Sequence, residues 1–219
     1  MLKERGYIFK NISQLNDDGE ISINFDDSYQ CIYRNAFPIL QEMNIPATFF
    51  VITDYIGRKN MWDVKLSKDR AKHLDDLQIK ELIRYGWELG SHTRSHRCLT
   101  LLARDELIKE IKLSKEELEN RFGVKVRSLS VPFGRLNQRV IELALEFGYE
   151  KICGFFPFKY YFNGVNKFIV PRIAVYSVDN IGNIVNKISS DRKRLFFEVL
   201  KQNVINFCAN GTILTKSIS

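Results

Sequence analysis

The feature that most constrains the fold of this chain is the alternation of short apolar runs with longer segments of helical periodicity. Short runs of β-branched and aromatic residues are typical of strands, and apolar residues spaced by three and four are typical of helices. Strands are predicted at residues 21–25, 47–52, 87–91, 126–130, 151–154 and 168–170, with a last apolar step at 212–214. Helices are predicted at residues 32–43, with Pro38 at a helix start or a kink, and at residues 74–85, 104–121, 136–147, 178–188 and 192–209.

Strands that alternate with helices form a parallel sheet with the helices packed outside it. No glycine-rich phosphate-binding turn follows the first predicted strand, which favours a barrel over an open dinucleotide-binding sheet. The 219 residues contain no boundary rich in proline, serine and glycine, so we expect a single α/β domain over residues 1–219. An aromatic segment, residues 155–166, is expected to be either a packed hairpin or a platform on which sugar rings stack.

The composition excludes several classes of protein. Hydrophobic residues make up 45% and charged residues 27%, which is ordinary globular usage and argues against a disordered or collagen-like chain. No apolar run approaches the roughly 18–20 residues of a membrane span. The net charge of +7 is scattered among acidic residues, apart from the basic cluster 192–194, so nucleic-acid binding is not expected.

The cysteines and the amino-terminal segment bear on the cellular compartment. Each of the four cysteines lies beside apolar residues and none forms a CxxC pair, so we expect buried free thiols, with disulfides as the alternative in a secreted protein. The first ten residues have no apolar signal-peptide core, which predicts a cytoplasmic protein as written. A true start further upstream would instead allow an extracytoplasmic location. The cysteines are Cys31, Cys98, Cys153 and Cys208.

Polar and turn-forming residues follow three of the predicted strands. Asp26 and Asp27 come directly after residues 21–25, and His92 follows residues 87–91, with His96 four residues later. The segment Val131-Pro132-Phe133-Gly134 follows residues 126–130. Because reactive groups gather at the carboxyl ends of strands in barrels and parallel sheets, these residues are expected at the same face of the fold.

The residue types at this face are suited to a metal site. Two histidines spaced by four can direct both imidazoles at one ion, and a carboxylate would complete a three-ligand site of the catalytic kind, with one position open for water. Of two adjacent aspartates, one can bind the ion while the other accepts a proton. The alternative is that His92 and His96 are ordinary surface or core residues and that the aspartates cap a helix. The third histidine, His73, is predicted to be a surface or capping residue.

Three segments resemble the motifs of the polysaccharide deacetylases, the NodB-homology or carbohydrate esterase 4 family. INFDDSY resembles the first motif, usually written TFDD, and LGSHTRSH resembles the second, H-[ST]-x-x-H. SLSVPFGRLNQRVIELALEFGYEKI resembles the third, in which a Pro-aromatic-Gly turn precedes a helix. The resemblance covers roughly Met1 to Asp179, and the occurrence of the three motifs in this order is highly specific.

The resemblance implies a distorted (β/α) barrel of about seven strands. It implies a divalent metal held by Asp27, His92 and His96, with Zn²⁺ as the first expectation and Co²⁺ or Ni²⁺ as alternatives. It assigns Asp26 as the catalytic base. It also implies that Pro132 and Phe133 line the substrate site, with the Phe133 backbone N–H helping to hold the oxyanion.

The sequence departs from the family pattern at three places. The arginine of the third motif is replaced by Ser130 or Val131, and Arg172 is predicted to supply its charge and to orient Asp26. The histidine of the late motif is absent, with Lys216 near its position, which leaves the general acid open. An opening strand is absent as well, so we expect an exposed sheet edge that a helix, a loop or a second copy of the chain covers.

The resemblance implies removal of N-acetyl groups from the amino sugars of a glycan. Two alternatives stay open from the sequence. One is a weak or inactive relative that binds glycan without turnover, which the absent late histidine favours. The other is a metal hydrolase that acts on O-acetyl esters or other acyl groups.

Overall fold

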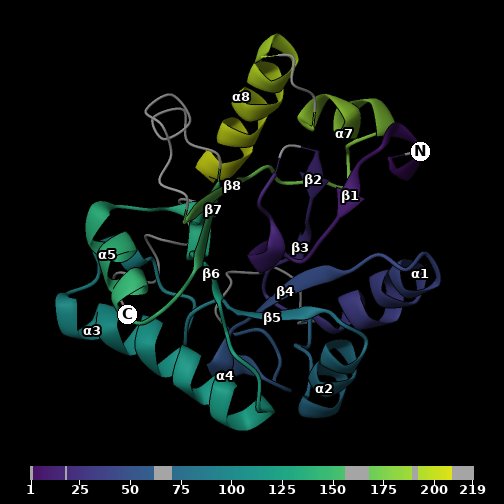
Figure 1. Ribbon diagram of the computed structural model, residues 1–219. Coiled ribbons are helices and arrows are strands. Elements are labelled where there is room, and N and C mark those ends of the chain that lie inside the picture. Colours follow the sequence, from purple (N-terminus) through teal and green to yellow (C-terminus); the bar gives the residue numbers. More distant parts are fainter. Residues whose placement is uncertain (1, 18, 62–70, 156–167, 189–191, 209–219) are drawn as a thin grey trace.

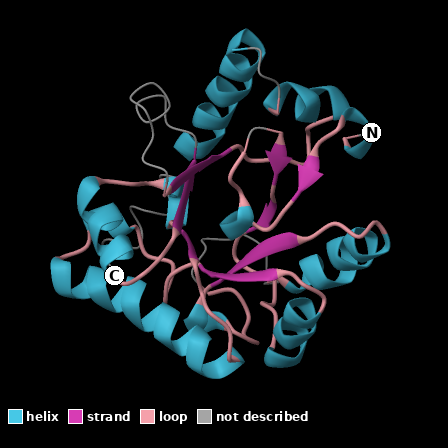
Figure 2. Cartoon of the chain, viewed as in Figure 1, coloured by secondary structure: helices cyan, strands magenta, loops and turns pink. Residues whose placement is uncertain are grey.

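The computed structural model describes residues 2–17, 19–61, 71–155, 168–188 and 192–208. At its centre is a six-stranded parallel sheet whose strand order, β3-β4-β5-β6-β7-β8, follows the chain. The sheet curls into a half-barrel with helices around its outside (Figures 1 and 2), which confirms the predicted α/β class and distorted barrel. The strands are β3 (Ile23–Phe25), β4 (Ala47–Val51), β5 (Glu88–Ser91), β6 (Ser128–Ser130), β7 (Lys151–Phe155) and β8 (Ile169–Arg172).

The helices lie close to the predicted ranges. The segment predicted at 104–121 is helical throughout, but a π-helical turn, Lys109–Leu113, joins two α-helices there. Asp75 caps the helix predicted at 74–85, because its side chain accepts a hydrogen bond from the Gln78 N–H at 3.1 Å. The α-helices are α1 (Phe37–Glu42), α2 (Asp76–Arg84), α3 (Arg104–Ile108), α4 (Ser114–Phe122), α5 (Gln138–Glu146), α7 (Ile181–Lys187) and α8 (Arg192–Cys208). A second π-helical turn, Ile32–Ala36, precedes α1, and short 3-10 turns lie at Lys3–Arg5, Ile12–Gln14, Thr53–Tyr55, Leu99–Leu101 and Pro132–Gly134.

The prediction of one strand over residues 21–25 was wrong in part. This stretch is divided into β2 (Glu20–Ile21), which pairs in parallel with β1 (Ile8–Phe9) in a separate two-stranded sheet, and β3, which pairs with β4. The chain between β1 and β2 is bound at the amino ends of the main strands. The Ile12 N–H donates to Thr48 Oγ1 at 2.9 Å, and Lys151 Nζ donates to the Leu15 carbonyl at 2.9 Å.

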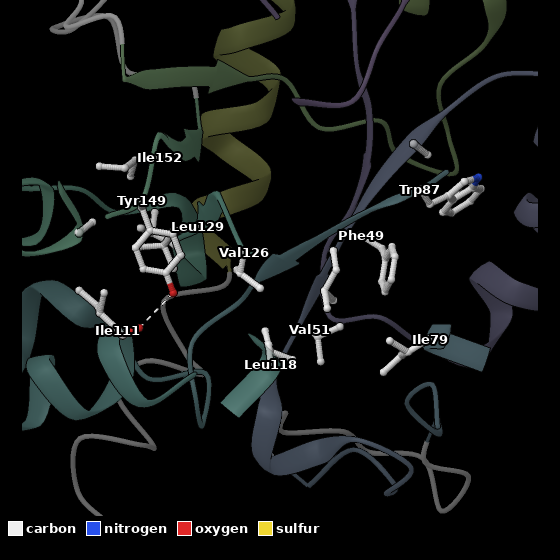
Figure 3. Close-up of a cluster of buried hydrophobic side chains, with 14 of the residues drawn as sticks. Phe49, Val51, Ile79, Trp87, Ile111, Leu118, Val126, Leu129, Tyr149 and Ile152 are labelled. Carbon is white, nitrogen blue, oxygen red and sulfur yellow. Dashed lines mark hydrogen bonds between the residues drawn. The ribbon is translucent and has the colours of Figure 1, made fainter. Parts of the chain in front are cut away.

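Alternate strand residues face two separate hydrophobic clusters, as the two-residue period of a strand requires. Phe49 and Val51 point outward, where they pack against α2 and α4 (Figure 3). Phe50 points into the curl of the sheet, where it clusters with the fully buried Ile12 and Cys153. Gly90 makes room for this ring, since a Cβ there would lie 2.4 Å from Phe50 Cδ1.

Some sequence predictions are corrected or lie outside the described residues. Cys98 and Cys153 are buried free thiols as predicted, but Cys31 is exposed, because it precedes the π-helical turn on the solvent side. The aromatic segment from residue 156 onward, the apolar step at 212–214 and Lys216 lie outside the described residues. No helix in the described part of the chain is both long and apolar enough to cross a membrane.

A buried ionic cluster connects α7 and α8 to the loop that follows β8. The Asp179 carboxylate is fully buried and accepts hydrogen bonds from Lys187 and from Lys201, the second at 2.6 Å. Lys187 Nζ also donates to the Ala174 carbonyl at 2.7 Å. Burial disfavours the ionised carboxylate, but the hydrogen bonds from the two lysines outweigh it and hold the pKa of Asp179 well below its usual range.

We expect Asp179→Asn to lower the free energy of unfolding at neutral pH by about 2 kcal/mol, because the buried Lys187 loses a charged hydrogen-bond partner. A carboxylate whose pKa is lower in the folded chain stabilises the fold fully above its unfolded pKa of about 3.9 and progressively less as the pH falls below it. Urea unfolding should therefore show a steeper loss of stability below about pH 4 for the wild-type chain than for Asp179→Asn. Identical pH profiles would contradict the assignment, and the exposed Asp105→Asn serves as the control.

Candidate metal site at the carboxyl ends of the strands

The structure brings the predicted polar residues together at one end of the sheet. Asp26 and Asp27 follow β3, and His92 follows β5, with His96 on the loop after it. The 3-10 turn Pro132–Gly134 follows β6 by one residue. Arg172 is the last residue of β8. Six parallel strands in one curled sheet place these carboxyl ends around a common centre, which is why residues so distant in sequence meet.

Asp27, His92 and His96 form a compact group of possible metal ligands. Asp27 Oδ1 lies 3.4 Å from His92 Nε2 and 3.5 Å from His96 Nε2. The three ligand atoms all lie within 4.8 Å of one another. Asp27 Oδ1 is buried and makes no hydrogen bond to any described residue, so this oxygen and the two imidazole nitrogens face a common point. One carboxylate and two imidazoles suit a divalent ion such as zinc, with coordination positions left for substrate or water.

The orientation of His92 is set by a hydrogen bond from its other ring nitrogen. His92 Nδ1 lies 2.7 Å from the Ser130 carbonyl oxygen, and because a carbonyl only accepts, Nδ1 carries the proton. This tautomer leaves Nε2 as the nitrogen directed at Asp27. Burial disfavours the protonated ring, but the Asp26 and Asp27 carboxylates outweigh it and raise the pKa of His92.

Backbone strain is concentrated around this site. Left-handed backbone conformations cost on the order of 1–3 kcal/mol at non-glycine residues and persist only where surrounding contacts enforce them. The structure has six described non-glycine residues with positive φ, and all but Asn44 belong to the loops of the site. They are Asp27 (φ 63°), Ser28 (50°), Thr93 (66°), His96 (60°) and Phe133 (60°).

A buried glutamate holds the loop that carries His96. Glu110 lies on the π-helical turn between α3 and α4. It accepts hydrogen bonds from the Arg94 N–H at 3.0 Å and the Ser95 N–H at 2.9 Å. It also accepts the Ser95 hydroxyl proton. The His96 N–H donates to Thr93 Oγ1 at 3.2 Å. Sequence analysis missed Glu110, although it lies three residues after Leu107 and therefore on the apolar face of the helix, whereas the neighbouring Lys109 is exposed.

Asp26 lies outside the ligand group and is held by an arginine. Arg172 Nη1 and Nη2 donate to the two carboxylate oxygens of Asp26 at 2.8 and 2.9 Å. Arg172 Nη2 also donates to Ser130 Oγ at 2.6 Å. Burial works against ionisation, but the Arg172 charge and its hydrogen bonds lower the pKa of Asp26 to about 2. Asp26 is therefore a carboxylate throughout the neutral range.

The Pro132–Phe133 turn forms one wall beside the ligand group. The Phe133 ring lies 4.9 Å from the His96 ring, centroid to centroid, at 62°. Gly134 follows with φ 64°, and the Phe155 ring packs so closely on it that a Cβ would come within 2.2 Å. Only glycine tolerates both the positive φ and the lack of space for a Cβ. This turn is therefore fixed in place next to His96.

The prediction that His73 is a surface or capping residue was wrong. Its side chain is buried, with 2% of its surface exposed, and its Nδ1 lies 2.6 Å from the Asp27 carbonyl oxygen. Burial lowers the pKa of His73. The neighbouring sequence, AKHLDD, carries no periodic signal that would have indicated this, because the contact is made across 46 residues. Ser130 was named only as a replacement for a motif arginine, and its contact with Arg172 comes from the curl of the sheet.

The fold and the ligand group together define a curled α/β barrel with a candidate metal site at the carboxyl ends of its strands. The family model described as polysaccharide deacetylase matches residues 14–152. The chain therefore belongs to the polysaccharide deacetylase family.

Individual relatives agree with this assignment. The chain is 34% identical over 128 residues to the poly-beta-1,6-N-acetyl-D-glucosamine N-deacetylase of Staphylococcus epidermidis. The aligned region covers 55% of this chain and 42% of that protein. The protein of the same name from Staphylococcus aureus is 27% identical over 168 residues, covering 73% of this chain and 52% of its own length. The chain thus spans about half the length of these curated relatives.

Solved structures share the fold. The Streptococcus pyogenes deacetylase PplD, in complex with acetate, matches with a TM-score of 0.69 at 22% identity, over 86% of this chain and 82% of that chain. IcaB from Ammonifex degensii matches with a TM-score of 0.67 at 23% identity, over 80% of each chain. These similarities establish the distorted barrel as the common architecture.

Proposed function

We propose that this protein is a metal-dependent hydrolase that removes N-acetyl groups from the amino sugars of a glycan. The observation that carries the proposal is an ionised carboxylate, Asp26, held by Arg172 directly beside the Asp27, His92 and His96 group. Metal-assisted hydrolysis of an amide uses both a site for a Lewis acid and a separate proton acceptor. The named function of the staphylococcal relatives, deacetylation of poly-N-acetylglucosamine, supports a β-linked N-acetylglucosamine polymer as the substrate class.

Asp27, His92 and His96 would hold the ion, and zinc is the first choice for one carboxylate and two imidazoles. When bound, such an ion polarises the acetyl carbonyl and makes a water molecule more acidic. Asp26 would accept the proton of the attacking water, since it is ionised and is not among the grouped ligand atoms. Arg172 and Ser130 would keep its carboxylate in a fixed orientation.

Pro132 and Phe133 would line the substrate position, with the Phe133 backbone N–H as a donor to the developing oxyanion. The three histidines of the sequence are all placed, two in the ligand group and His73 against the Asp27 backbone. None of these histidines is left to protonate the departing amine, so we assign that proton to solvent.

The direct test is acetate release from N-acetylglucosamine oligomers by protein loaded with Zn²⁺, Co²⁺ or Ni²⁺. Chelated protein serves as the blank, and oligomers with β-1,6 and β-1,4 linkages define the polymer. Acetate released from acetylated xylan alone would favour the esterase alternative. Stoichiometric metal without release from any substrate would overturn the hydrolase proposal in favour of glycan binding without turnover.

Replacing Arg172 should weaken catalysis without removing the metal. We expect Arg172→Ala to lower kcat by about 10–100-fold, the usual cost of losing a residue that orients a catalytic group. The pKa of Asp26 should rise, because its cationic partner is gone, so the acid limb of the pH–rate profile moves to higher pH. Steady-state kinetics from about pH 4 to 8, with metal content measured on the same samples, would check both effects. The exposed Arg104→Ala is the matched control, and wild-type turnover in metal-loaded Arg172→Ala would refute this role.

A further inference from the structure

His73 belongs to a short segment that is paired with the loop carrying Asp27. Tyr29 and His73 form an antiparallel bridge. The Gln30 N–H donates to the Lys72 carbonyl at 2.8 Å, and the Leu74 N–H donates to the Ser28 carbonyl at 2.8 Å. These backbone hydrogen bonds fix the two segments side by side and set the His73 side chain beneath the Asp27 backbone.

The His73 ring has a defined orientation and a defined tautomer. It packs against the rings of Tyr29 and Tyr55, at centroid distances of 4.7 and 5.4 Å. Its Nδ1 must carry the proton, because its partner at 2.6 Å is the Asp27 carbonyl oxygen, which can only accept. The opposite nitrogen, Nε2, is buried and has no hydrogen-bond partner among the described residues. The one polar interaction found for this ring is therefore directed at the Asp27 backbone.

The Asp27 backbone needs such support. Asp27 and Ser28 are consecutive left-handed residues, a conformation that costs L-residues roughly 1–2 kcal/mol each. Ser28 is held independently of His73: its N–H donates to the Asp26 carbonyl at 2.8 Å and its hydroxyl donates to the Phe50 carbonyl at 2.7 Å. The carbonyl of Asp27 itself receives its hydrogen bond from His73 Nδ1.

We propose that His73 is a positioning residue for the metal site, which fixes the Asp27 backbone through Nδ1 so that the Asp27 carboxylate faces His92 and His96. A rotation at Asp27 would turn Oδ1 away from the two Nε2 atoms, since the side chain leaves the same strained residue. His73 thus preorganises a ligand without touching the ion. The inference rests on the metal site of the proposed function and is independent of the substrate.

The test compares metal binding by variants that differ in the donor at the Nδ1 position. His73→Asn places an amide N–H near Nδ1, His73→Gln places it near Nε2, and His73→Leu removes it. We expect the Co²⁺ and Zn²⁺ affinities of His73→Leu and His73→Gln to fall by about 10–100-fold, as is typical when a group that orients a ligand is lost. The affinity of His73→Asn should remain within about threefold of the wild type. The visible absorption spectrum of bound Co²⁺ should change in His73→Leu and His73→Gln and be retained in His73→Asn.

Thermal unfolding of the metal-free variants separates positioning from general stability. All three substitutions lose the imidazole that packs against Tyr29 and Tyr55. The ranking of the three variants by stability of the metal-free chain should therefore differ from their ranking by metal affinity. Tyr55→Phe, which keeps a ring against His73, is the packing control. Wild-type affinity in His73→Leu or His73→Gln, or an affinity of His73→Asn as low as theirs, would overturn the inference. Wild-type protein that binds metal but releases no acetate would defeat the proposed function and leave this comparison intact.

Discussion

His92→Ala should lose both the metal and the hydrolytic activity. The remaining pair, Asp27 and His96, offers only two protein ligands, whereas catalytic zinc sites use three. The Lewis-acid contribution to such reactions amounts to several kcal/mol, so we expect turnover to fall by about 10³-fold or more. Metal content after dialysis and acetate release from N-acetylglucosamine oligomers measure the two effects on the same sample.

Chelation of the wild-type chain provides the matching control for His92→Ala. Removal of the ion should produce a loss of the same size, and its return should restore the wild-type chain but not the variant. Thermal unfolding in the metal-free state shows whether the substitution also damages the fold, since His92 is buried and bonded to the Ser130 carbonyl. Full metal content together with full turnover in His92→Ala would remove this residue from the ligand group.

We expect Asp26→Asn to lower the rate of hydrolysis strongly while leaving metal binding intact. An amide of the same shape cannot accept a proton at neutral pH, and loss of a general base typically lowers the rate by about 10²–10⁴-fold. Asp27, His92 and His96 are untouched, so one ion per chain should remain bound. The kcat of metal-loaded protein, measured beside the exposed Asp105→Asn, gives the expected contrast.

Either of two results would contradict the role of Asp26. Loss of the metal in Asp26→Asn would place Asp26 among the ligands and would require a different proton acceptor. Unchanged kcat would exclude Asp26 as the base. The amide also presents N–H donors to Arg172, whose guanidinium can only donate, so a small loss of stability is expected and should be measured separately.

The sequence predicted the features that depend on local pattern. The main-sheet strands from β4 onward and the described α-helices fall where apolar periodicity and caps indicated them. The meeting of Asp27, His92 and His96 followed from a general property of parallel strands, whose carboxyl ends share one side of the sheet. The structure also places Arg172 against Asp26, as its spacing suggested, and the catalytic role of that pair stays a prediction.

Other features could not be read from local pattern because they depend on contacts across the fold. The division between β2 and β3 follows from the pairing of β2 with β1, a contact between residues 8–9 and 20–21 that no local pattern encodes. The role of His73 depends on pairing between residues 28–30 and 72–74, which no periodicity encodes. The exposure of Cys31 depends on where a π-helical turn begins, and an apolar neighbour in sequence says little about that.

The contact between Arg172 and Asp26 has a consequence for how the site is assembled. Asp26 follows the first strand of the main sheet and Arg172 ends the last one, so this ion pair joins the two opposite margins of the half-barrel. A nascent chain that has folded only as far as β7 already contains all three proposed ligands. Asp26, the proposed base, is not yet in contact with Arg172 at that stage. Such an intermediate would bind the ion but lack the Arg172 contact to Asp26. The proposed hydrolysis would therefore begin only after β8 has folded.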